Sequence, residues 1–459
     1  MIVDNPSLNA AAVISRTIPT SGEYQSTEDW LNGDTRSIDL VPSALQKSTV
    51  HFNKVREIHR QPWIWPRKPI IFIADPHADA VAFERSLKAS GAVSDISSNA
   101  VTLNAFGRDS RIVIGGDCLD KGPSNLALLD AIKKLKDSGA DVTLLAGNHD
   151  VRLLMGLRCL EQQDNLLTSH MFLRMGAKIV PLLQEVYVRY VQPRRPCLNT
   201  PTAKACEDYL FPKGQWLQAF PKLAAGKMSD RAIQKELDRL QQKIAEFKQA
   251  ALAHGMDMQA LYETALACKS LFLDTDGQYH WFFDSMTIAH QAGSFLFLHA
   301  GLDDEIACLL AREGVDKLNT LYDKQVRNNL FDFYYGPVAN TMRTKYRADD
   351  DFRLTHYGVA KLKAVGIHAV VHGHQNRHHG QRMVLREDLL HFECDTTMDC
   401  HSRLKEGLRP NGFGVTLILP EGKVLGISSD YARPKCFQPS FSQRPTAEQS
   451  LSLKLVAHP

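Results

Sequence analysis

Five short apolar runs, each followed by residues that can bind a metal, constrain this chain more than any other feature. Each run has the length of a buried β-strand. The sequences at the ends of the five runs, including the residues that follow them, are ADPHAD, GGDCLDKG, AGNHD, LHAG and VHGH. Because parallel-sheet proteins bind ligands just beyond the carboxyl ends of their strands, the five ends are predicted to lie around one point. Carboxylates, an amide and imidazoles would meet there.

A strand–helix–strand pattern runs through the second and third of these runs. Residues 111–117 and 141–150 each begin as a strand, and the segment between them places apolar residues on one helical face. Pro123 is expected in the first turn of this helix and Gly139 at its C-terminal end. The pattern favours a parallel sheet that is covered on both faces.

The pattern then breaks, and residues 161–290 are predicted to be a mainly helical insertion. One helix in it spaces its apolar residues by four and three, as on the contact face of a packed helix. These residues are Ile233, Leu237, Leu240, Ile244, Phe247 and Ala251. The helix either packs on a neighbour or belongs to a hairpin that projects as a lid or partner arm. A Pro-rich linker is expected at 192–203.

These changes divide the chain into five predicted segments. Residues 66–160 and 291–430 would form the two halves of an α/β core around the insertion. Residues 1–65 would be an N-terminal extension that wraps or precedes the core. Residues 431–459 are polar and Pro-rich, which predicts a loose tail.

Composition excludes several classes of protein. The 459 residues carry 54 basic and 51 acidic side chains, a balance that argues against bulk nucleic-acid binding. No apolar run approaches the roughly 18 residues that a membrane span needs. The N-terminus shows no secretory signal, and the nine cysteines lack C-x-x-C spacing, which is typical of free thiols in a reducing compartment. A cytoplasmic protein with no nucleic-acid or membrane partner is expected.

Together the motifs resemble those of the calcineurin-like metallophosphoesterases, in particular the phosphoprotein phosphatase-like branch. The family signature is D-x-H, G-D-x-x-D-R/K-G, G-N-H-D/E, then H and G-H blocks. Here the blocks stand as Asp75-Pro76-His77, Gly116 to Gly122, Gly147 to Asp150, His299 and Gly373-His374. The resemblance implies an α/β fold of the metallophosphoesterase type, a β-sandwich flanked by helices, to which this chain adds a large helical insertion.

The resemblance also implies a site for two divalent metal ions. Asp75, His77 and Asp117 would hold the first ion. Asp117 would bridge to the second, which would be held also by Asn148, His299 and His374. Mixed nitrogen and oxygen ligands suit Mn, Fe or Zn better than Mg or Ca, and we expect Mn with Fe or Zn as alternatives.

Two further residues would serve proton transfer. In the family, the second acid of the G-D-x-x-D block orients the histidine of G-N-H, which protonates the leaving oxygen. The resemblance therefore makes His149 the general acid and Asp120 the residue that orients it. Alternatively, Asp120 caps the helix that follows.

Substrate contacts are expected from Lys121 and an arginine. Lys121 stands where phosphoprotein phosphatases often have arginine, and lysine offers a point charge rather than a bidentate fork. Arg347, 27 residues before His374, is preferred by spacing over Arg343 and Arg353. The alternative for this segment is a solvated basic face.

The predicted function is that of a dinuclear metal-dependent phosphatase. A hydroxide bridging the metals would attack phosphomonoesters, most plausibly of phosphoproteins. The alternative enzyme is a hydrolase of dinucleoside polyphosphates such as diadenosine tetraphosphate. A third reading is a scaffold with a degenerate site, but intact ligands at all six positions argue against it. Partner contact through residues 161–290 could accompany catalysis.

Overall fold

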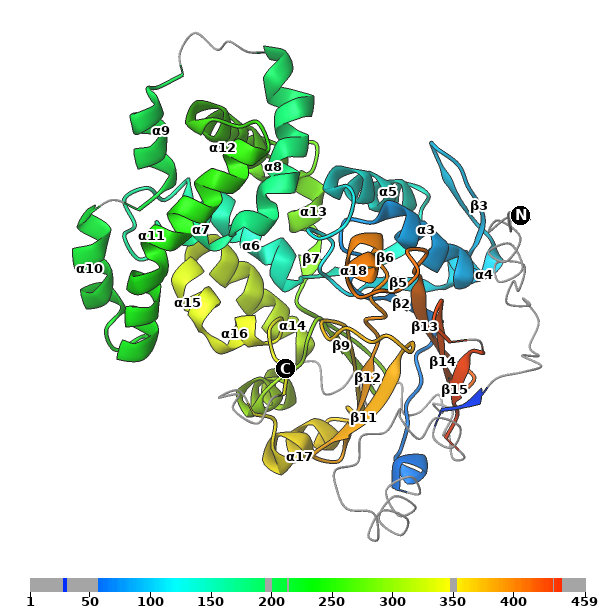
Figure 1. Cartoon of the computed structure of the whole chain (residues 1–459). Helices are drawn as coiled ribbons and strands as arrows, with labels where there is room; N and C mark the ends of the chain where they lie inside the picture. Colours follow the sequence, from blue (N-terminus) through cyan, green and yellow to red (C-terminus); the bar gives the residue numbers. More distant parts are fainter. Residues whose placement is uncertain are drawn as a thin grey trace.

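A computed structural model of the chain describes residues 28–30, 57–194, 200–212, 214–346, 353–431 and 433–439. Two β-sheets form its centre, and helices surround them (Figure 1). None of the described helices is long and apolar enough to cross a membrane. The eight cysteines in the described ranges are all free thiols.

The larger sheet has eight strands, and four of them run mutually parallel, including the three that lead to the site. In spatial order they are β1 (Glu28–Asp29), β15 (Lys435–Phe437), β14 (Lys423–Ser428), β13 (Gly414–Leu419), β2 (Ile70–Ile73), β5 (Arg111–Ile114), β6 (Asp141–Leu145) and β7 (Met286–Thr287). β2, β5, β6 and β7 are mutually parallel. β13, however, pairs antiparallel with β2, so the sheet is mixed rather than wholly parallel as predicted. The parallel prediction rested on a strand–helix–strand unit, and β13 belongs instead to a hairpin with β14.

The second sheet has five strands. Its order is β11 (Arg382–Arg386), β12 (Leu389–Glu393), β10 (Ala369–His372), β9 (Phe295–Leu298) and β8 (Ala289–Ala292). β10 runs parallel to both of its neighbours, β9 and β12. The five predicted strand ends therefore belong to two sheets, three to the first and two to the second. A separate two-stranded ribbon consists of β3 (Val93–Ile96) and β4 (Val101–Leu103).

An aromatic layer holds the two sheets together. Phe72 of β2 lies 5.8 Å from Phe297 of β9, measured between ring centroids, and both side chains are fully buried. The predicted N-terminal extension adds Trp30, Trp63 and Trp65 to this layer. Burial of large rings contributes about 2 kcal/mol or more each, which explains how two sheets with short strands stay together. The fold is thus an α/β sandwich flanked by helices, as predicted.

Helices cover the outer faces of both sheets. On the first lie α3 (Ala80–Ala89), α4 (Ala105–Asp109) and α5 (Asn125–Asp137); around the second lie α14 (Asp304–Asn328), α15 (Leu330–Tyr335), α16 (Pro337–Asn340) and α17 (His356–Ala364). The last helix, α18 (Cys400–Lys405), follows β12. Ser124 caps α5 by accepting a hydrogen bond from the Ala127 N–H, so Pro123 precedes the helix and does not lie in its first turn as expected. Gly139 follows its C-cap with φ 83°, as predicted.

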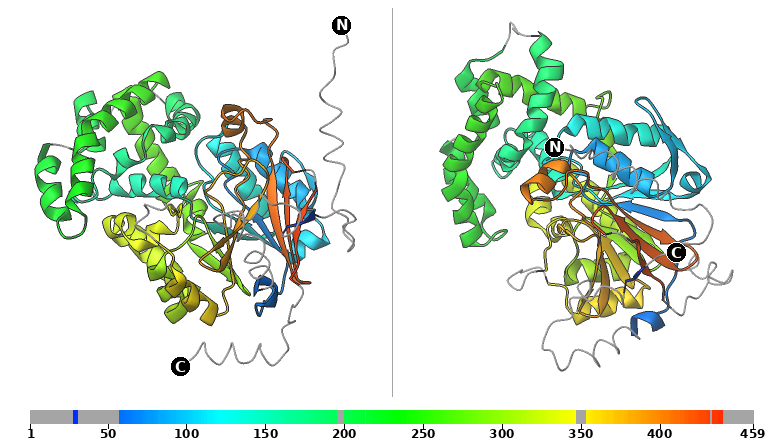
Figure 2. Two further views of the ribbon diagram at one scale, coloured as in Figure 1. Left: turned by 60° about the horizontal axis from the view of Figure 1, so that its bottom comes forward. Right: turned by 45° about the vertical axis from the view of Figure 1, so that its right-hand side comes forward.

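A lobe of helices lies beside the sandwich, between β6 and β7 in the sequence (Figure 2). After α6 (Asn148–Cys159) come α7 (Met171–Arg174), η1 (Ala177–Ile179), α8 (Val180–Val186), η2 (Tyr187–Val191), η3 (Gln192–Arg194), α9 (Ala203–Leu210), α10 (Gly214–Ala224), α11 (Asp230–Ala253), α12 (Met258–Leu273) and α13 (His280–Asp284). The spaced apolar residues lie on α11, where Phe247 is fully buried 5.5 Å from Phe172 of α7. The apolar face of α11 is therefore used within the lobe. Residues 195–199 of the expected linker lie outside the described residues.

The C-terminal region departs from its prediction. Residues 431–459 were expected to be a loose tail, yet Lys435–Phe437 form strand β15, antiparallel to β14. Phe437 is fully buried in the aromatic layer, and Lys435 Nζ donates to the carbonyl oxygens of His379 and Gln381. A single buried phenylalanine among polar residues was too weak a pattern to predict this strand.

Candidate active site

The predicted ligands meet at one edge of the sandwich. Asp75 lies two residues beyond β2 and Asp117 three beyond β5, while Asn148 opens α6 just after β6. His299 directly follows β9, and His374 lies two residues beyond β10. Parallel strands point their carboxyl ends the same way, and the aromatic layer brings the two sets of ends together.

Two groups of side chains could each hold a metal ion. One consists of Asp75, His77 and Asp117, and the other of Asp117, His299 and His374. Within each group the ligand atoms all lie within 4.8 Å of one another. Asp117 belongs to both groups, as a carboxylate that bridges two ions would.

Hydrogen bonds turn two histidines so that their Nε2 atoms face Asp117. His77 Nδ1 lies 3.3 Å from the Leu119 carbonyl oxygen, and His299 Nδ1 lies 2.8 Å from that of Gly115. In the neutral imidazole, a proton on the Nδ1 that donates to the carbonyl leaves the lone pair on Nε2. His299 Nε2 lies 3.4 Å from Asp117 Oδ1 and 3.3 Å from the side-chain amide group of Asn148. This orientation is the one metal ligation needs.

The loops that carry these residues are strained. The backbone φ angle is positive at Asp75, His77, Asp117, Asp120, Lys121 and His374. Such angles cost non-glycine residues about 1 kcal/mol or more, and they persist only where the surroundings hold them. Gly147 permits a close approach, since a Cβ there would lie 1.9 Å from the Asp117 backbone nitrogen.

The charges of the site are out of balance. Burial and the neighbouring Asp395 raise the pKa of Asp75 well above its usual range. Burial opposes ionisation of Asp117 too, but His299, His149 and His77 hold its pKa well below the usual range. Burial would lower the pKa of His299, yet Asp117 and Asp75 raise it to about 10. These carboxylates attract any positive charge that can reach them.

Divalent metal ions fit this arrangement. Asp75 Oδ1 is buried and has no hydrogen-bond partner among the described residues. A buried carboxylate oxygen without a partner costs about 1–3 kcal/mol or more, and a cation would remove that cost. The donor set of carboxylates, imidazoles and one amide suits transition metals.

Asp120 and His149 form a buried pair beside the ligands. His149 Nδ1 lies 2.7 Å from Asp120 Oδ2, and the two residues are 6% and 2% exposed. His149 Nε2 faces Asp117 Oδ2 at 3.9 Å. Because Ser124 caps α5, the alternative in which Asp120 serves as that cap is wrong.

Lys121 extends over the first ligand group. Its Nζ lies 2.7 Å from His77 Nε2, the atom that would bind a metal, so ammonium and metal would compete for that lone pair. Lys121 is exposed, which leaves its side chain room to move. Arg347, the predicted second phosphate contact, lies outside the described residues.

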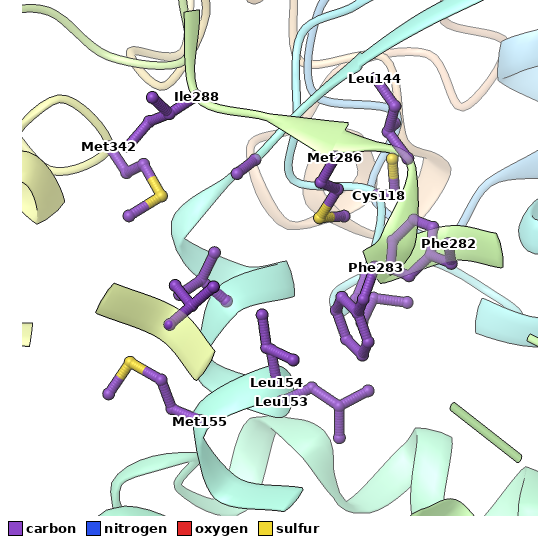
Figure 3. Close-up of a cluster of buried hydrophobic side chains, with 14 of the residues drawn as sticks. Cys118, Leu144, Leu153, Leu154, Met155, Phe282, Phe283, Met286, Ile288 and Met342 are labelled. Carbon is purple, nitrogen blue, oxygen red and sulfur yellow. The ribbon is translucent and has the colours of Figure 1, made fainter. Parts of the chain in front are cut away.

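Behind the ligands lies a cluster of apolar side chains (Figure 3). It joins Leu153, Leu154 and Met155 of α6 to Phe282 and Phe283 of α13, and it includes Met286, Leu144 and Cys118. Cys118 is fully buried between the two acids of its turn. The cluster anchors the start of α6, and with it Asn148 and His149.

Comparison with known proteins agrees with these observations. Residues 68–200 match the family model described as calcineurin-like phosphoesterase. This segment is a calcineurin-like phosphoesterase domain. The predicted resemblance to the calcineurin-like family is confirmed, and so is the predicted enzyme class, a metal-dependent phosphoric ester hydrolase, whereas the phosphoprotein phosphatase-like branch stays a prediction. No curated protein matches the sequence.

Several solved phosphatase structures are similar at a low level. A cold-active protein tyrosine phosphatase is 17% identical, with 84% of each chain covered and a TM-score of 0.43. The cold-active protein tyrosine phosphatase of the psychrophile Shewanella sp. is 15% identical, with 83% of this chain and 84% of that chain covered and a TM-score of 0.40. A protein serine/threonine phosphatase from Saccharomyces cerevisiae is 12% identical over 86% of this chain and 89% of that chain, with a TM-score of 0.34. These values are too low to bear on the substrate.

Sequence reasoning missed two buried acids beside the candidate ligands. Asp150 accepts from the Leu119 N–H at 3.0 Å and the Gly147 N–H at 3.2 Å, and so ties two ligand loops together. Asp395 is 1% exposed and interacts with Asp75. It follows β12 as the other acids follow their strands, and that pattern could have revealed it.

Sequence reasoning also missed a basic residue that the helical lobe contributes. Lys178 of η1 interacts with Arg152 and Lys121, and burial together with these two charges lowers its pKa. It interacts favourably with Asp120. No motif marks Lys178, because its role depends on where the lobe places it.

Proposed function

We propose that the chain is a dinuclear metal-dependent phosphatase that hydrolyses phosphomonoesters, with phosphoproteins as the expected substrates. The observation that carries this proposal is the membership of Asp117 in both groups of ligands. A shared carboxylate reduces the repulsion between two cations held close together. Two such ions can stabilise both the attacking and the leaving oxygen of an in-line phosphoryl transfer to water.

The chain would hold the ions through six side chains. The first ion would take Asp75, His77 and Asp117, and the second Asp117, Asn148, His299 and His374, with Mn expected and Fe or Zn as alternatives. When bound, the ions supply Lewis-acid activation of water and neutralise phosphoryl charge. The carbonyls of Leu119 and Gly115 keep His77 and His299 in the ligating tautomer.

His149 would protonate the oxygen of the departing alcohol. Its Nδ1–H donates to Asp120, which leaves Nε2 facing the site as the atom that delivers a proton. Asp120 fixes the orientation of the ring. Lys121 and Lys178 would attract the anionic substrate.

The first test combines metal, substrate and one substitution. The Mn-loaded protein should hydrolyse p-nitrophenyl phosphate, and Asp117→Asn should abolish this activity while the protein stays folded by circular dichroism. The control is Asp130→Asn, which alters a half-exposed acid on α5 and should retain activity. Full activity in Asp117→Asn would overturn the proposal.

The second test separates substrate classes. Phosphoserine, phosphothreonine and phosphotyrosine peptides are compared with diadenosine tetraphosphate by kcat/KM. Preference for a phosphopeptide supports the proposal, and preference for diadenosine tetraphosphate would replace it with the hydrolase of dinucleoside polyphosphates. Partner contact through residues 161–290 is proposed only for their outward polar faces, because the apolar face of α11 is buried.

A further inference from the structure

A carboxylate from the helical lobe covers the N-terminus of α5. Glu185 of α8 accepts four hydrogen bonds there. The donors are Ser124 Oγ at 2.6 Å, the Asn125 N–H at 2.8 Å, Asn125 Nδ2 at 2.9 Å and the Leu126 N–H at 3.0 Å. Backbone N–H groups at a helix start have no partner within the helix, and an anion suits them.

Asn125 connects Glu185 to the turn that contains Asp120 and Lys121. Its side chain is held at one end by Glu185, and at the other its Oδ1 accepts the Asp120 N–H at 2.8 Å. Asn125 is only 1% exposed, so water does not replace these bonds. Asp120 and Lys121 both have φ of 70°, a conformation that must be held in place.

Asp120 then aims His149. Its Oδ2 is the carboxylate atom that His149 Nδ1 contacts, and its Oδ1 has no hydrogen-bond partner among the described residues. No other hydrogen bond to this carboxylate is seen in the described part of the chain, so the turn itself must set its direction. A change in the turn would therefore turn the imidazole away from the leaving oxygen.

We propose that Glu185 is a positioning residue through which the helical lobe holds the general acid in place. The inference rests on the proposed function, because it requires His149 to protonate the leaving group. Glu185 makes no hydrogen bond to the metal ligands in the described part of the chain, and it acts through Asn125 and Asp120. The lobe thereby becomes part of the catalytic apparatus rather than an appendage.

A purely structural role would have a different signature. If Glu185 only stabilised α5, its loss would lower the unfolding midpoint and would affect all substrates alike. If it positions His149, the effect of removing Glu185 on kcat/KM must depend on the leaving group, because nitrophenolate departs with little help and an alkoxide needs a proton. The ratio of kcat/KM for p-nitrophenyl phosphate to that for an alkyl phosphate measures this dependence.

The experiment compares Glu185→Ala and Glu185→Gln in the full-length Mn-loaded protein. In Glu185→Ala, kcat/KM should fall about 10-fold or more for the alkyl phosphate but less than about 3-fold for p-nitrophenyl phosphate. Glu185→Gln keeps the volume and one acceptor oxygen, so it should fold normally and show a smaller rise of the same ratio. Adding Asn125→Ala to Glu185→Ala should raise the ratio no further than Asn125→Ala alone, because both act through one chain of contacts.

The matched control is Asp130→Asn, on the same helix and the same interface. Asp130 accepts from Tyr279 Oη at 3.2 Å and from Arg189 Nη1 at 3.4 Å, both from the lobe, but has no contact with Asp120. This variant should leave the ratio unchanged. A Glu185→Gln protein that is folded and has the wild-type ratio would overturn the inference.

Asp120→Asn separates this outcome from failure of the proposed function. If Asp120→Asn raises the ratio and the Glu185 variants do not, the general acid stands and the role of Glu185 falls. If neither Asp120→Asn nor His149→Ala changes the ratio, the general-acid role falls, and the inference falls with it.

Discussion

Two buried charge clusters lie near the ends of strands, and they differ in how their charge is balanced. One surrounds Glu393, the last residue of β12, which is fully buried. Its carboxylate accepts from Arg377 Nε at 2.6 Å and Arg382 Nε at 2.9 Å, and it also pairs with Arg386. The other surrounds Asp117, where carboxylates meet imidazoles and one carboxylate oxygen of Asp75 has no hydrogen-bond partner among the described residues.

The pKa values show the same difference. Burial would raise the pKa of Glu393, but His372 and the three arginines hold it at about 2. Burial and Asp395 raise the pKa of Asp75 instead. The arginines of the first cluster keep the Glu393 carboxylate ionised, whereas the histidines and Lys121 of the second do not offset the effects of burial and Asp395 on the pKa of Asp75. A balanced cluster stabilises the fold, and an unbalanced one is suited to bind metals.

The largest expected effect is on the unbalanced cluster. Asp117→Asn removes the carboxylate common to both ligand groups, and we expect kcat/KM to fall at least about 1,000-fold, or about 4 kcal/mol in activation free energy. Bound Mn, measured by elemental analysis after gel filtration, should fall as well. An Asp117→Asn protein that keeps two ions per chain would show that Asp117 does not bridge.

The balanced cluster should respond in stability rather than activity. Glu393→Gln leaves three partly buried guanidinium groups without their anion, and we expect a loss of about 3 kcal/mol in the free energy of unfolding. Urea denaturation at pH 7 measures it. Glu387→Gln, which removes an exposed ion pair with His356, is the control and should change stability by less than about 0.5 kcal/mol.

Lowering the pH should reduce the difference in the free energy of unfolding between wild type and Glu393→Gln. The pKa of Glu393 is lower in the folded protein, about 2, than its ordinary value of 4.5. Its ionised form therefore contributes stability above pH 4.5, and this contribution is lost as the pH falls through about 2. A stability gap that is the same at pH 3 as at pH 7 would mean that the carboxylate charge is not what stabilises the cluster.

Metal binding should raise the free energy of unfolding through the unbalanced cluster and not through the cluster around Glu393. At 100 times its dissociation constant, Mn should add about 2.7 kcal/mol to the free energy of unfolding. Thermal denaturation with and without chelator should show this in wild type and in Glu393→Gln, and much less in Asp75→Asn. An equal rise in Asp75→Asn would place the stabilising ion elsewhere.

The sequence predicted the ligand loops well because their information is local. Strand ends are readable from short apolar runs, and the type of residue that follows each run determines what it can bind. Asp75, Asp117 and His299 were found in this way. The pairing of Asp120 with His149 came from the family resemblance.

What the sequence left out depends on distant contacts. Glu185 and Lys178 come from the helical lobe, and no spacing relates them to Asp120. The balanced cluster was missed for the same reason. In the sequence, Arg377, Arg382 and Arg386 look like surface charges, and only the pairing of β11 with β12 brings them to the buried Glu393. A mixed sheet was missed because antiparallel β13 looks, by composition, like its parallel neighbour.

The smallest expected effect concerns Lys121, the cation that partly offsets the unbalanced cluster. Its Nζ contacts His77 Nε2, and it lowers the pKa of Asp75 against the larger effects of burial and Asp395. Lys121→Gln removes a charge that competes with the metal, so Mn should bind on the order of 5-fold more tightly, which corresponds to about 1 kcal/mol. KM for phosphate esters should rise at the same time, because the substrate loses an attractive charge. Isothermal titration with Mn and steady-state kinetics measure the two changes, and weaker Mn binding would show that Lys121 supports the metal site instead of opposing it.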